Sequence, residues 1–362
     1  MFKQSCQFQS NLITELEISN LNAFELINRV LSMDNTLFLI DENVYQIYFA
    51  GLQIDKPCYI LKAEEQHKSL YQSQEIYNFL LTNNCSRNHY IVVFGGGIST
   101  DIGAWIASTF KRGTKLLLIP TTLLAMIDAA LGGKTALNHN GIKNLIGSFY
   151  PADKIIICPS FLQSLPADEY YNGLVECLKT LLIIQDFDKA NKLLSEKIIN
   201  EDDIYLIANT KLSICANDLY DKGARRLLNL GHSFAHIIES LSDNAIPHGA
   251  AVAWGMLFAY EYSLKKKLLD IEKTNQLKDL LNKLIKASPS LYQHSKILFS
   301  NIMLDKAKTQ VHHLILNDKK NNGSLKLILF DTQQIIVYQE DNIEEVEIFF
   351  INQLKSRYQL EK

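Results

Sequence analysis

The first 160 residues alternate short apolar runs of strand length with stretches that have a helical pattern. The runs lie at residues 36–40, 58–61, 90–94, 115–119 and 154–158, and several are almost continuously apolar. Continuous apolar runs are typical of parallel strands that are buried on both faces. Strands that alternate with helices predict βαβ units, so we expect an α/β domain here.

The pattern changes near residue 160 and becomes mostly helical, from Asp168 to roughly Lys286. Two β-like runs at residues 325–330 and 334–338 precede a closing amphipathic helix that begins at about Asn342. A chain of 362 residues also exceeds the usual size of a single core. We therefore predict two domains, an α/β domain at residues 1–160 and a mainly α-helical domain at residues 161–362.

Composition and charge exclude several classes of protein. The net charge is −3 and no long run of Lys or Arg occurs, which argues against a nucleic-acid binder. No apolar run approaches the roughly 18 residues of a membrane span, and the N-terminus lacks a signal-peptide pattern. Six scattered cysteines without a CxxC pair are typical of reduced thiols, so we expect a cytoplasmic protein.

A strand-like run ends at three glycines, Gly95 to Gly97, and a helical pattern starts directly after them. Glycine lets the backbone approach a ligand closely, and the N–H groups at a helix start favour a pyrophosphate. A tight turn without a ligand fits the triplet about as well. Asp41 ends the first strong strand and favours a nucleotide, because a carboxylate there can bind the hydroxyls of an adenosine ribose. An ordinary aspartate in a turn is the alternative.

Glu176, His232 and His248 each lie in an apolar, helix-like context, where an unpartnered charge or imidazole costs free energy. Two imidazoles and one carboxylate leave the fourth position of a tetrahedral Zn²⁺ open, as at a catalytic metal site. Each residue alone can instead be a satisfied core residue or a surface group. The same segments carry further cationic and polar residues, which favours a site: Lys179, Lys211, Arg225, Asn229 and His236.

Glycine-rich turns between residues 111 and 147 carry more cations, which suit a phosphate or carboxylate substrate. A solvated loop is the alternative reading for Lys111 and Lys143. The charged and amide residues singled out in this region are Lys111, Arg112, Asp128, Lys134, Lys143 and Asn144.

These motifs, in order and over nearly the whole chain, closely resemble the 3-dehydroquinate synthase family of the sugar phosphate cyclase superfamily. The resemblance rests on PTTLLAMID from Pro120, GGKTALNH from Gly132, KNLIGSFY from Lys143, GLVECLK from Gly173, RRLLNLGHSFAH from Arg225 and DKK from Asp318. It implies an N-terminal NAD-binding α/β domain, a C-terminal helical domain that holds Zn²⁺ or Co²⁺, and a homodimer.

Matched residue by residue, the resemblance implies three sets of site residues. The metal ligands are Glu176, His232 and His248. The NAD site is lined by Asp41, Asn43, Glu65, Lys68, Gly96, Gly97, Asp101, Thr121, Thr122, Lys134 and Lys143. The substrate is bound by Asp128, Lys134, Asn144, Lys179, Lys211, Arg225, Asn229, His236 and one of Lys319 and Lys320. Arg112 is similar to the arginine that reaches the phosphate from the neighbouring subunit.

The implied reaction is that of a lyase in the shikimate pathway, which leads to chorismate and the aromatic amino acids. It converts 3-deoxy-D-arabino-heptulosonate 7-phosphate to 3-dehydroquinate and phosphate by transient NAD oxidation, phosphate elimination, re-reduction and aldol closure. One alternative is a cyclase that makes 2-epi-5-epi-valiolone or 2-deoxy-scyllo-inosose. Another is a metal-dependent oxidoreductase of the glycerol dehydrogenase type. Arg225, Asn229, His236 and Lys320 favour a substrate with an anomeric carboxylate.

The chain departs from the family pattern at a few positions. Thr100 precedes Asp101 where relatives usually carry glycine, and we expect a bulkier residue there to change how the backbone meets the pyrophosphate. Ala250 follows Gly249 where relatives usually carry glutamate, which is expected to affect a local hydrogen bond but no metal ligand.

Overall fold

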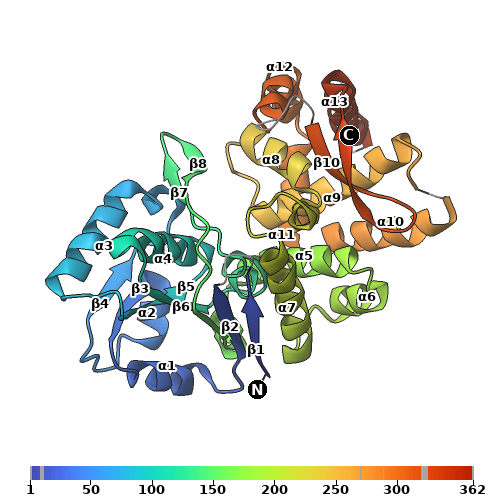
Figure 1. Cartoon of the computed structure of the whole chain (residues 1–362). Helices are drawn as coiled ribbons and strands as arrows, with labels where there is room; N and C mark the ends of the chain where they lie inside the picture. The colour runs from blue at the N-terminus through green and yellow to red at the C-terminus, as the bar shows by residue number, and fades with distance from the viewer. Residues whose placement is uncertain (1, 9–11, 270, 288, 319–324, 361–362) are drawn as a thin grey trace. The chain divides into compact units, whose positions relative to one another are not determined.

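The computed structural model describes residues 2–8, 12–269, 271–287, 289–318 and 325–360. Packing divides the chain into two compact units (Figure 1). The first unit consists of Met1–Gly173 and Ile199–Lys222, and the second of Leu174–Ile198 and Gly223–Lys362. Each unit is therefore assembled from two separate stretches of chain. The domain boundary expected near residue 160 stays a prediction, because it rests on the change of sequence pattern rather than on packing.

A seven-stranded sheet lies at the centre of the first unit, in the order β1-β2-β9-β6-β5-β3-β4. β1 and β2 are antiparallel, and the other neighbouring strands pair in parallel. The strands are β1 (Phe2–Gln7), β2 (Ile13–Ile18), β3 (Thr36–Asp41), β4 (Cys58–Leu61), β5 (Tyr90–Gly95), β6 (Lys115–Pro120) and β9 (Lys154–Ile157).

Helices connect the parallel strands of this sheet. They are α1 (Ala23–Leu31), α2 (Glu42–Tyr48), α3 (Leu70–Thr82) and α4 (Gly97–Thr109). Figure 1 shows α3 and α4 on one side of the sheet and α1 and α2 on the other. β3, β5 and β6 are buried along almost their whole length, as their apolar sequences predict. The predicted α/β architecture is confirmed.

Short elements between the strands carry several predicted site residues. β7 (Leu137–His139) and β8 (Ile142–Ile146) form a separate hairpin. The stretch around Asp128 contains a π-helical turn at Ala125–Ala129. π-Helical turns are rare in proteins, and those that occur are often found at functional sites. Turns of 3₁₀ helix lie at Glu65–His67, Phe110–Arg112 and Pro159–Ser164.

Helix α7 (Glu201–Asn217) belongs to the first unit although it comes after the first part of the second unit in the sequence. Tyr205 of α7 stacks on Phe2 of β1 with ring centroids 4.7 Å apart, and its hydroxyl donates to Gln4 Oε1 at 2.9 Å. α7 also packs against the π-helical turn. This packing brings Lys211 into the same unit as Asp128.

The second unit is mainly helical, as predicted, and its helices continue to Asp318, well beyond the expected end near Lys286. A hairpin of β10 (Leu325–Phe330) and β11 (Ile335–Glu340) lies at the predicted place. In the described part of the chain, no helix combines the length and apolar character needed to cross a membrane. The unit contains the end of α5 (Ala167–Ile183), α6 (Phe187–Glu196), a 3₁₀ turn at Ala224–Asn229, α8 (His232–Leu241), α9 (His248–Lys265), α10 (Ile271–Lys286), α11 (Pro289–Leu298), α12 (Asn301–Asp318) and α13 (Ile343–Leu360).

Candidate active site

Glu176 lies on α5, in the part that belongs to the second unit, and its side chain is completely buried. Lys179 follows three residues later, so the two side chains share one face of the helix. They form an ion pair. The pairing is needed because an isolated ionised group away from water costs several kcal/mol.

His232 and His248 are the first residues of α8 and α9. Gly231 precedes His232 with φ of 80°, a left-handed conformation that glycine adopts without strain. A Cβ on Gly255 of α9 would lie 2.1 Å from the carbonyl oxygen of Gly231. Because neither position carries a side chain, α8 begins directly against α9. His232 therefore lies beside His248, with ring centroids 5.3 Å apart.

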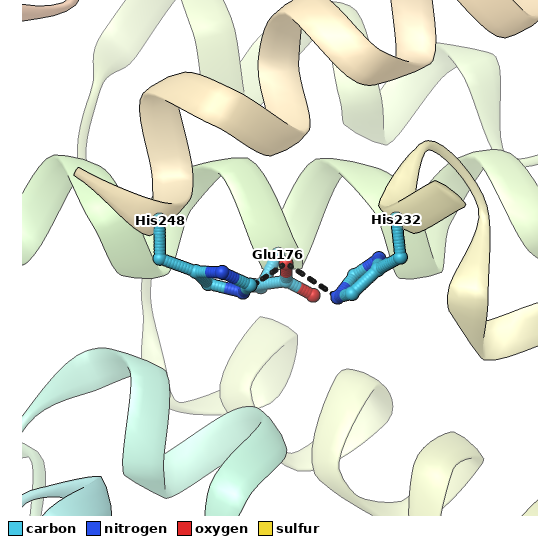
Figure 2. Close-up of side chains that lie close together, drawn as sticks. All are labelled: Glu176, His232 and His248. Atoms are coloured by element: carbon cyan, nitrogen blue, oxygen red, sulfur yellow. Dashed lines mark ion pairs between the residues drawn. The ribbon is translucent and has the colours of Figure 1, made fainter. Parts of the chain in front are cut away.

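The three side chains converge on one point (Figure 2). Nε2 of His232 lies 3.8 Å, and Nε2 of His248 lies 3.6 Å, from the same oxygen, Glu176 Oε1. Nδ1 of His232 lies 3.2 Å from the carbonyl oxygen of Leu230. Nδ1 of His248 lies 3.1 Å from Glu239 Oε1. These acceptors favour a proton on Nδ1, which leaves Nε2 of each ring as a potential ligand.

This arrangement fits a divalent transition metal. Zn²⁺ takes imidazole and carboxylate ligands at about 2.0–2.2 Å, so two ligand atoms of a tetrahedral site lie roughly 3.3–3.6 Å apart. The ligand atoms of Glu176, His232 and His248 lie within 4.8 Å of one another. Among the described residues, Oε2 of Glu176 is paired with Lys179 but Oε1 has no hydrogen-bond partner, and a bound cation would satisfy Oε1. The assignment of the three residues as ligands stays a prediction.

The charges around the cluster favour an ionised carboxylate. Burial alone would raise the pKa of Glu176, but the ammonium of Lys179 and the two imidazoles hold that pKa well below its ordinary value. Burial and the charge of Lys179 lower the pKa of His232. At His248 burial is outweighed by the carboxylates of Glu176 and Glu239, which raise the pKa to about 9. An ion that binds His248 must therefore displace a proton.

In the first unit, the glycine triplet joins β5 to α4 as predicted. A Cβ on Gly95 would lie 2.4 Å from Ser99 Oγ, and one on Gly96 would lie 3.0 Å from Thr122 Cγ2. Gly96 is the N-cap of α4 and no side chain caps this helix. The N–H groups of its first turn are therefore suited to an anionic ligand. Thr121 donates its N–H to the carbonyl oxygen of Gly95 at 3.0 Å, so the predicted threonine pair borders the turn.

Asp41 has structural partners at the end of β3. Its Oδ1 accepts the N–H of Asn43 at 2.9 Å and caps α2, and its Oδ2 accepts the hydroxyl of Ser99 at 3.0 Å. The buried Thr100 donates its hydroxyl to the carbonyl oxygen of Gly97 at 3.0 Å, within the first turn of α4. The binding of a ribose by Asp41 stays a prediction.

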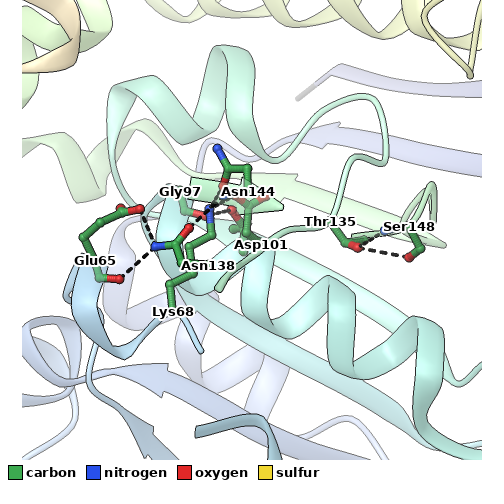
Figure 3. Close-up of polar contacts among 9 residues, drawn as sticks. Glu65, Lys68, Gly97, Asp101, Thr135, Asn138, Asn144 and Ser148 are labelled. Atoms are coloured by element: carbon green, nitrogen blue, oxygen red, sulfur yellow. Dashed lines mark hydrogen bonds and ion pairs between the residues drawn. The ribbon is translucent and has the colours of Figure 1, made fainter. Parts of the chain in front are cut away.

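A buried lysine joins residues from both predicted ligand sets of the first unit (Figure 3). Lys68 Nζ donates to Asp101 Oδ2 and to Asn144 Oδ1, each at 2.6 Å. Burial raises the pKa of Asp101, and the charge of Lys68 opposes that rise. Asn138, to which the sequence assigned no role, hydrogen bonds to Glu65 beside this group. Residues predicted to bind the cofactor and residues predicted to bind the substrate are thus linked by one hydrogen-bond network.

Two further ion pairs lie in the first unit. Lys134, whose side chain is 50% exposed, contacts Asp221 Oδ2 at 2.5 Å. Lys211 of α7 pairs with Asp128 of the π-helical turn. Each pair joins residues about 80 positions apart in the sequence, since the stretch 199–222 packs into this unit. Lys134 is therefore anchored at one side and accessible to solvent.

The remaining predicted residues have varied environments. Arg225 is buried in the 3₁₀ turn Ala224–Asn229, which also contains Asn229. The ring of His236 lies 5.8 Å from that of His232 on α8. Arg112 is exposed, and Lys143 borders a 350 Å³ pocket. Lys319 and Lys320 lie outside the described residues.

Glu239 is a site residue that motif reasoning missed. It lies on α8, three residues after His236 and seven after His232, so all three lie on about the same helix face. A carboxylate at this spacing, within the mainly apolar stretch Phe234 to Leu241, was the available sequence signal. Ala250, where a glutamate was expected, is completely buried, and Glu239 provides the carboxylate beside His248.

Two protein-family models together match residues 58–321 of this chain. The family model described as "3-dehydroquinate synthase N-terminal" matches residues 58–172, and "3-dehydroquinate synthase C-terminal" matches residues 173–321. The chain is 36% identical to the 3-dehydroquinate synthase of Clostridium tetani, over 86% of this chain and 84% of that one. It is 32% identical to the enzyme of Dehalococcoides mccartyi, over 84% and 85% of the two chains.

The chain belongs to the 3-dehydroquinate synthase family. Its function is that of 3-dehydroquinate synthase, a lyase, as the sequence predicts.

Solved structures with the same fold include other sugar phosphate cyclases. A 2-deoxy-scyllo-inosose synthase complexed with carbaglucose-6-phosphate, NAD+ and Co2+ covers 97% of this chain and 99% of its own, with a TM-score of 0.79 and 22% identity. The 2-epi-5-epi-valiolone synthase of Streptomyces hygroscopicus, with NAD+ and Zn2+ bound, covers 94% and 96%, with a TM-score of 0.72 and 24% identity. Because both identities are below 25%, these similarities show only that the two enzymes share the fold of this chain.

Proposed function

We propose that this family member converts 3-deoxy-D-arabino-heptulosonate 7-phosphate to 3-dehydroquinate and phosphate, with NAD as a catalytic cofactor and a divalent metal at Glu176, His232 and His248. The observation that supports this most strongly is the buried Glu176, because two imidazoles approach its Oε1 and this oxygen has no hydrogen-bond partner among the described residues. A site of two imidazoles and one carboxylate leaves a position open for substrate oxygens.

When bound, NAD would take up and return a hydride, and Zn²⁺ or Co²⁺ would polarise substrate oxygens as a Lewis acid. The protein's own part is to bind and orient these groups. Gly96, Gly97 and the uncapped start of α4 would receive the pyrophosphate. Lys134, Lys179 and Arg225 provide fixed positive charges, which favour a phosphorylated, carboxylated substrate.

The other cyclases are the second candidates, because their solved structures share the fold. Sequence favours the dehydroquinate reaction: relatives at 32–36% identity over most of the chain are 3-dehydroquinate synthases. The glycerol dehydrogenase alternative has less support, since the probable glycerol dehydrogenase of Sinorhizobium meliloti is 13% identical with a TM-score of 0.63. A cytoplasmic homodimer, with Arg112 reaching the neighbouring site, stays a prediction.

The test is product formation by purified, metal-loaded protein stripped of nucleotide. We expect inorganic phosphate and 3-dehydroquinate to appear from the heptulosonate phosphate when NAD⁺ is added, with no net formation of NADH. Glucose 6-phosphate, chosen because a solved 2-deoxy-scyllo-inosose synthase is complexed with carbaglucose-6-phosphate, should give no phosphate. Phosphate release at the full rate without NAD⁺ would overturn the proposed use of the cofactor.

A further inference from the structure

The side chain of Asn138, in β7, makes three hydrogen bonds to two other segments of the first unit (Figure 3). Its Nδ2 donates to Glu65 Oε1 at 2.7 Å and to the carbonyl oxygen of Glu65 at 3.0 Å. Its Oδ1 accepts the N–H of Asn144 at 2.8 Å. The backbone N–H of Asn138 donates to the carbonyl oxygen of Lys68 at 2.7 Å. One residue thus joins the turn Glu65–His67 to the hairpin β7–β8.

Thr135 and Ser148 hydrogen bond to each other at the base of the hairpin, but beyond this point its strand pairing is irregular. β7 pairs with β8 at Leu137↔Ile146 and His139↔Ile142, with an irregular register between them. Residues 139–145 are all exposed, and Asn144 has a positive φ of 54°. An isolated two-stranded hairpin is marginally stable in water. Its conformation therefore depends on its hydrogen bonds to the rest of the unit.

Lys68 closes the network into a ring. Its buried ammonium donates to Asn144 Oδ1 at 2.6 Å, while Asn138 holds the backbone of Asn144 and the side chain of Glu65. Glu65 and Lys68 are connected through the 3₁₀ turn. A displacement of the turn would therefore displace Asn144 as well.

The pocket beside the ring is lined by both segments. It has a volume of about 350 Å³ and is bordered by Glu65, Gln66 and Ser69 on one side and by Asn138, His139 and Lys143 on the other. A ligand in this pocket contacts the turn and the hairpin together. A ligand that stabilises one conformation of both segments therefore also stabilises the position of the other residues of the hairpin, including Asn144. Such coupling between two binding sites is reciprocal.

We propose that Asn138 is a positioning residue that couples occupation of this pocket by the adenosine part of NAD to the placement of Asn144 for the substrate. The inference rests on the proposed function, because Glu65 and Lys68 are assigned to the cofactor and Asn144 to the substrate. Without the Asn138 amide, cofactor and substrate would still bind, but neither would favour the other through this hairpin.

The central variant is Asn138→Asp, which keeps the shape of the side chain. It replaces the Nδ2 donor with an oxygen that repels Glu65. Asn138→Ala removes all three side-chain hydrogen bonds, including the one from the N–H of Asn144, without adding charge, and serves if the aspartate variant misfolds. Asn140→Asp is the matched control, because it adds the same charge to the same hairpin and pocket but removes none of the ring's hydrogen bonds. Circular dichroism and exchange protection of β5 report whether each variant is folded.

The first measurement is hydrogen–deuterium exchange of the segment 137–147 with and without saturating NAD⁺. We expect NAD⁺ to slow exchange of this segment at least about fivefold in the natural protein and in Asn140→Asp, and less than about twofold in the Asn138 variants. The second is the affinity of a non-reactive substrate analogue. NAD⁺ should tighten it by at least about fivefold in the natural protein and by less than about twofold after either Asn138 substitution.

The outcomes separate this inference from the proposed function. If the natural protein does not bind NAD⁺ at all, the proposed function fails. If NAD⁺ binds and supports turnover but the Asn138 variants keep the full NAD⁺-dependent protection and tightening, the coupling role of Asn138 is overturned. If Asn140→Asp also loses the NAD⁺-dependent protection and the tighter analogue binding, both effects depend on the charge in the pocket. That result would equally overturn the coupling role of Asn138.

Discussion

At the scale of single residues, two glycines determine where the first imidazole of the cluster lies. Gly231 turns the chain with a positive φ directly before His232, and Gly255 leaves room for its carbonyl oxygen. An alanine at Gly255 would place a methyl group 2.1 Å from that oxygen, so the start of α8 would have to move. His232 thus lies close to Glu176 only because neither glycine carries a side chain.

Lys134 is the residue whose role is tested most directly by a single substitution. Lys134→Met keeps the length of the side chain and removes the charge. We expect turnover to fall by at least about 100-fold, because loss of a positioned electrostatic group costs about 2.7–4 kcal/mol of barrier. NAD⁺ affinity should change less. Lys222→Met is the control, since it removes an exposed charge next to Asp221, the partner of Lys134. Near-normal turnover of Lys134→Met would make this lysine a surface charge.

Glu239 should determine how tightly the metal is held. Its carboxylate lies 3.1 Å from Nδ1 of His248, and such partners orient an imidazole and raise its basicity. We expect Glu239→Gln to weaken Zn²⁺ binding about 10–100-fold in competition with a chelator. His248→Ala should lose stoichiometric metal. Glu347→Gln is the matched control, because it removes a similar carboxylate contact, at 2.9 Å, from the surface residue His312. Equal Zn²⁺ affinities of Glu239→Gln and Glu347→Gln would refute this role.

At the scale of elements, β2 is an inner strand that carries a buried carboxylate. The side chain of Glu17 is 2% exposed and contacts Arg29 of α1 at 2.7 Å and Lys154 of β9 at 3.2 Å. Burial alone would raise the pKa of Glu17, but hydrogen bonds from these two cations lower it overall. The carboxylate therefore links β2 to both neighbouring elements only while it is ionised.

Glu17→Gln should destabilise the first unit in a pH-dependent way. The folded pKa lies below the ordinary value of 4.5, so the stabilisation is present above that pH and is lost as the pH falls through the folded pKa. We expect a loss of about 1–3 kcal/mol at pH 7 in native-state hydrogen exchange of β2, and a smaller loss at pH 4 and below. Glu15→Gln on the same strand, 61% exposed, should change stability by less than about 0.5 kcal/mol. A pH-independent loss would contradict the ionic explanation.

Elements with a strong apolar pattern were predictable from the sequence, and those held by polar contacts were not. The five predicted strands of the sheet follow from runs such as Ile91 to Phe94, which are fully buried. β1 and β2 were missed because the side chains of β1 are half-buried or exposed and β2 includes Glu17. The convergence of Glu176, His232 and His248 was expected from family motifs. The contact of Asn138 with Glu65 could not be, because it joins positions 73 residues apart with no pattern in either.

At the scale of the whole molecule, each unit is built from two stretches of chain, and the chain passes between the units three times. The stretch 199–222 carries α7, whose Tyr205 and Leu212 are packed into the first unit. The stretch 174–198 carries Glu176 and Lys179 for the second. Neither unit has all of its predicted site residues within one continuous segment.

A single cut between α5 and α6 should therefore leave the protein in one piece. A protease site inserted at the exposed turn Ile184 to Gln185 would divide the chain into two fragments, each with parts of both units. We expect the fragments to elute together in gel filtration under native conditions and to separate in denaturant. Separation in native buffer, with both fragments folded, would show that the interleaved stretches contribute little to the packing of the units.

The interleaving also has a consequence for how such a gene can change. A single recombination point between codons 174 and 222 would join one part of a unit to a foreign counterpart, so α7 or α5 would meet a surface that it does not match. Exchange of one whole unit requires three junctions, at residues 173, 198 and 222. The path of the chain thus prevents a single junction from exchanging either the sheet unit or the helical unit as a whole.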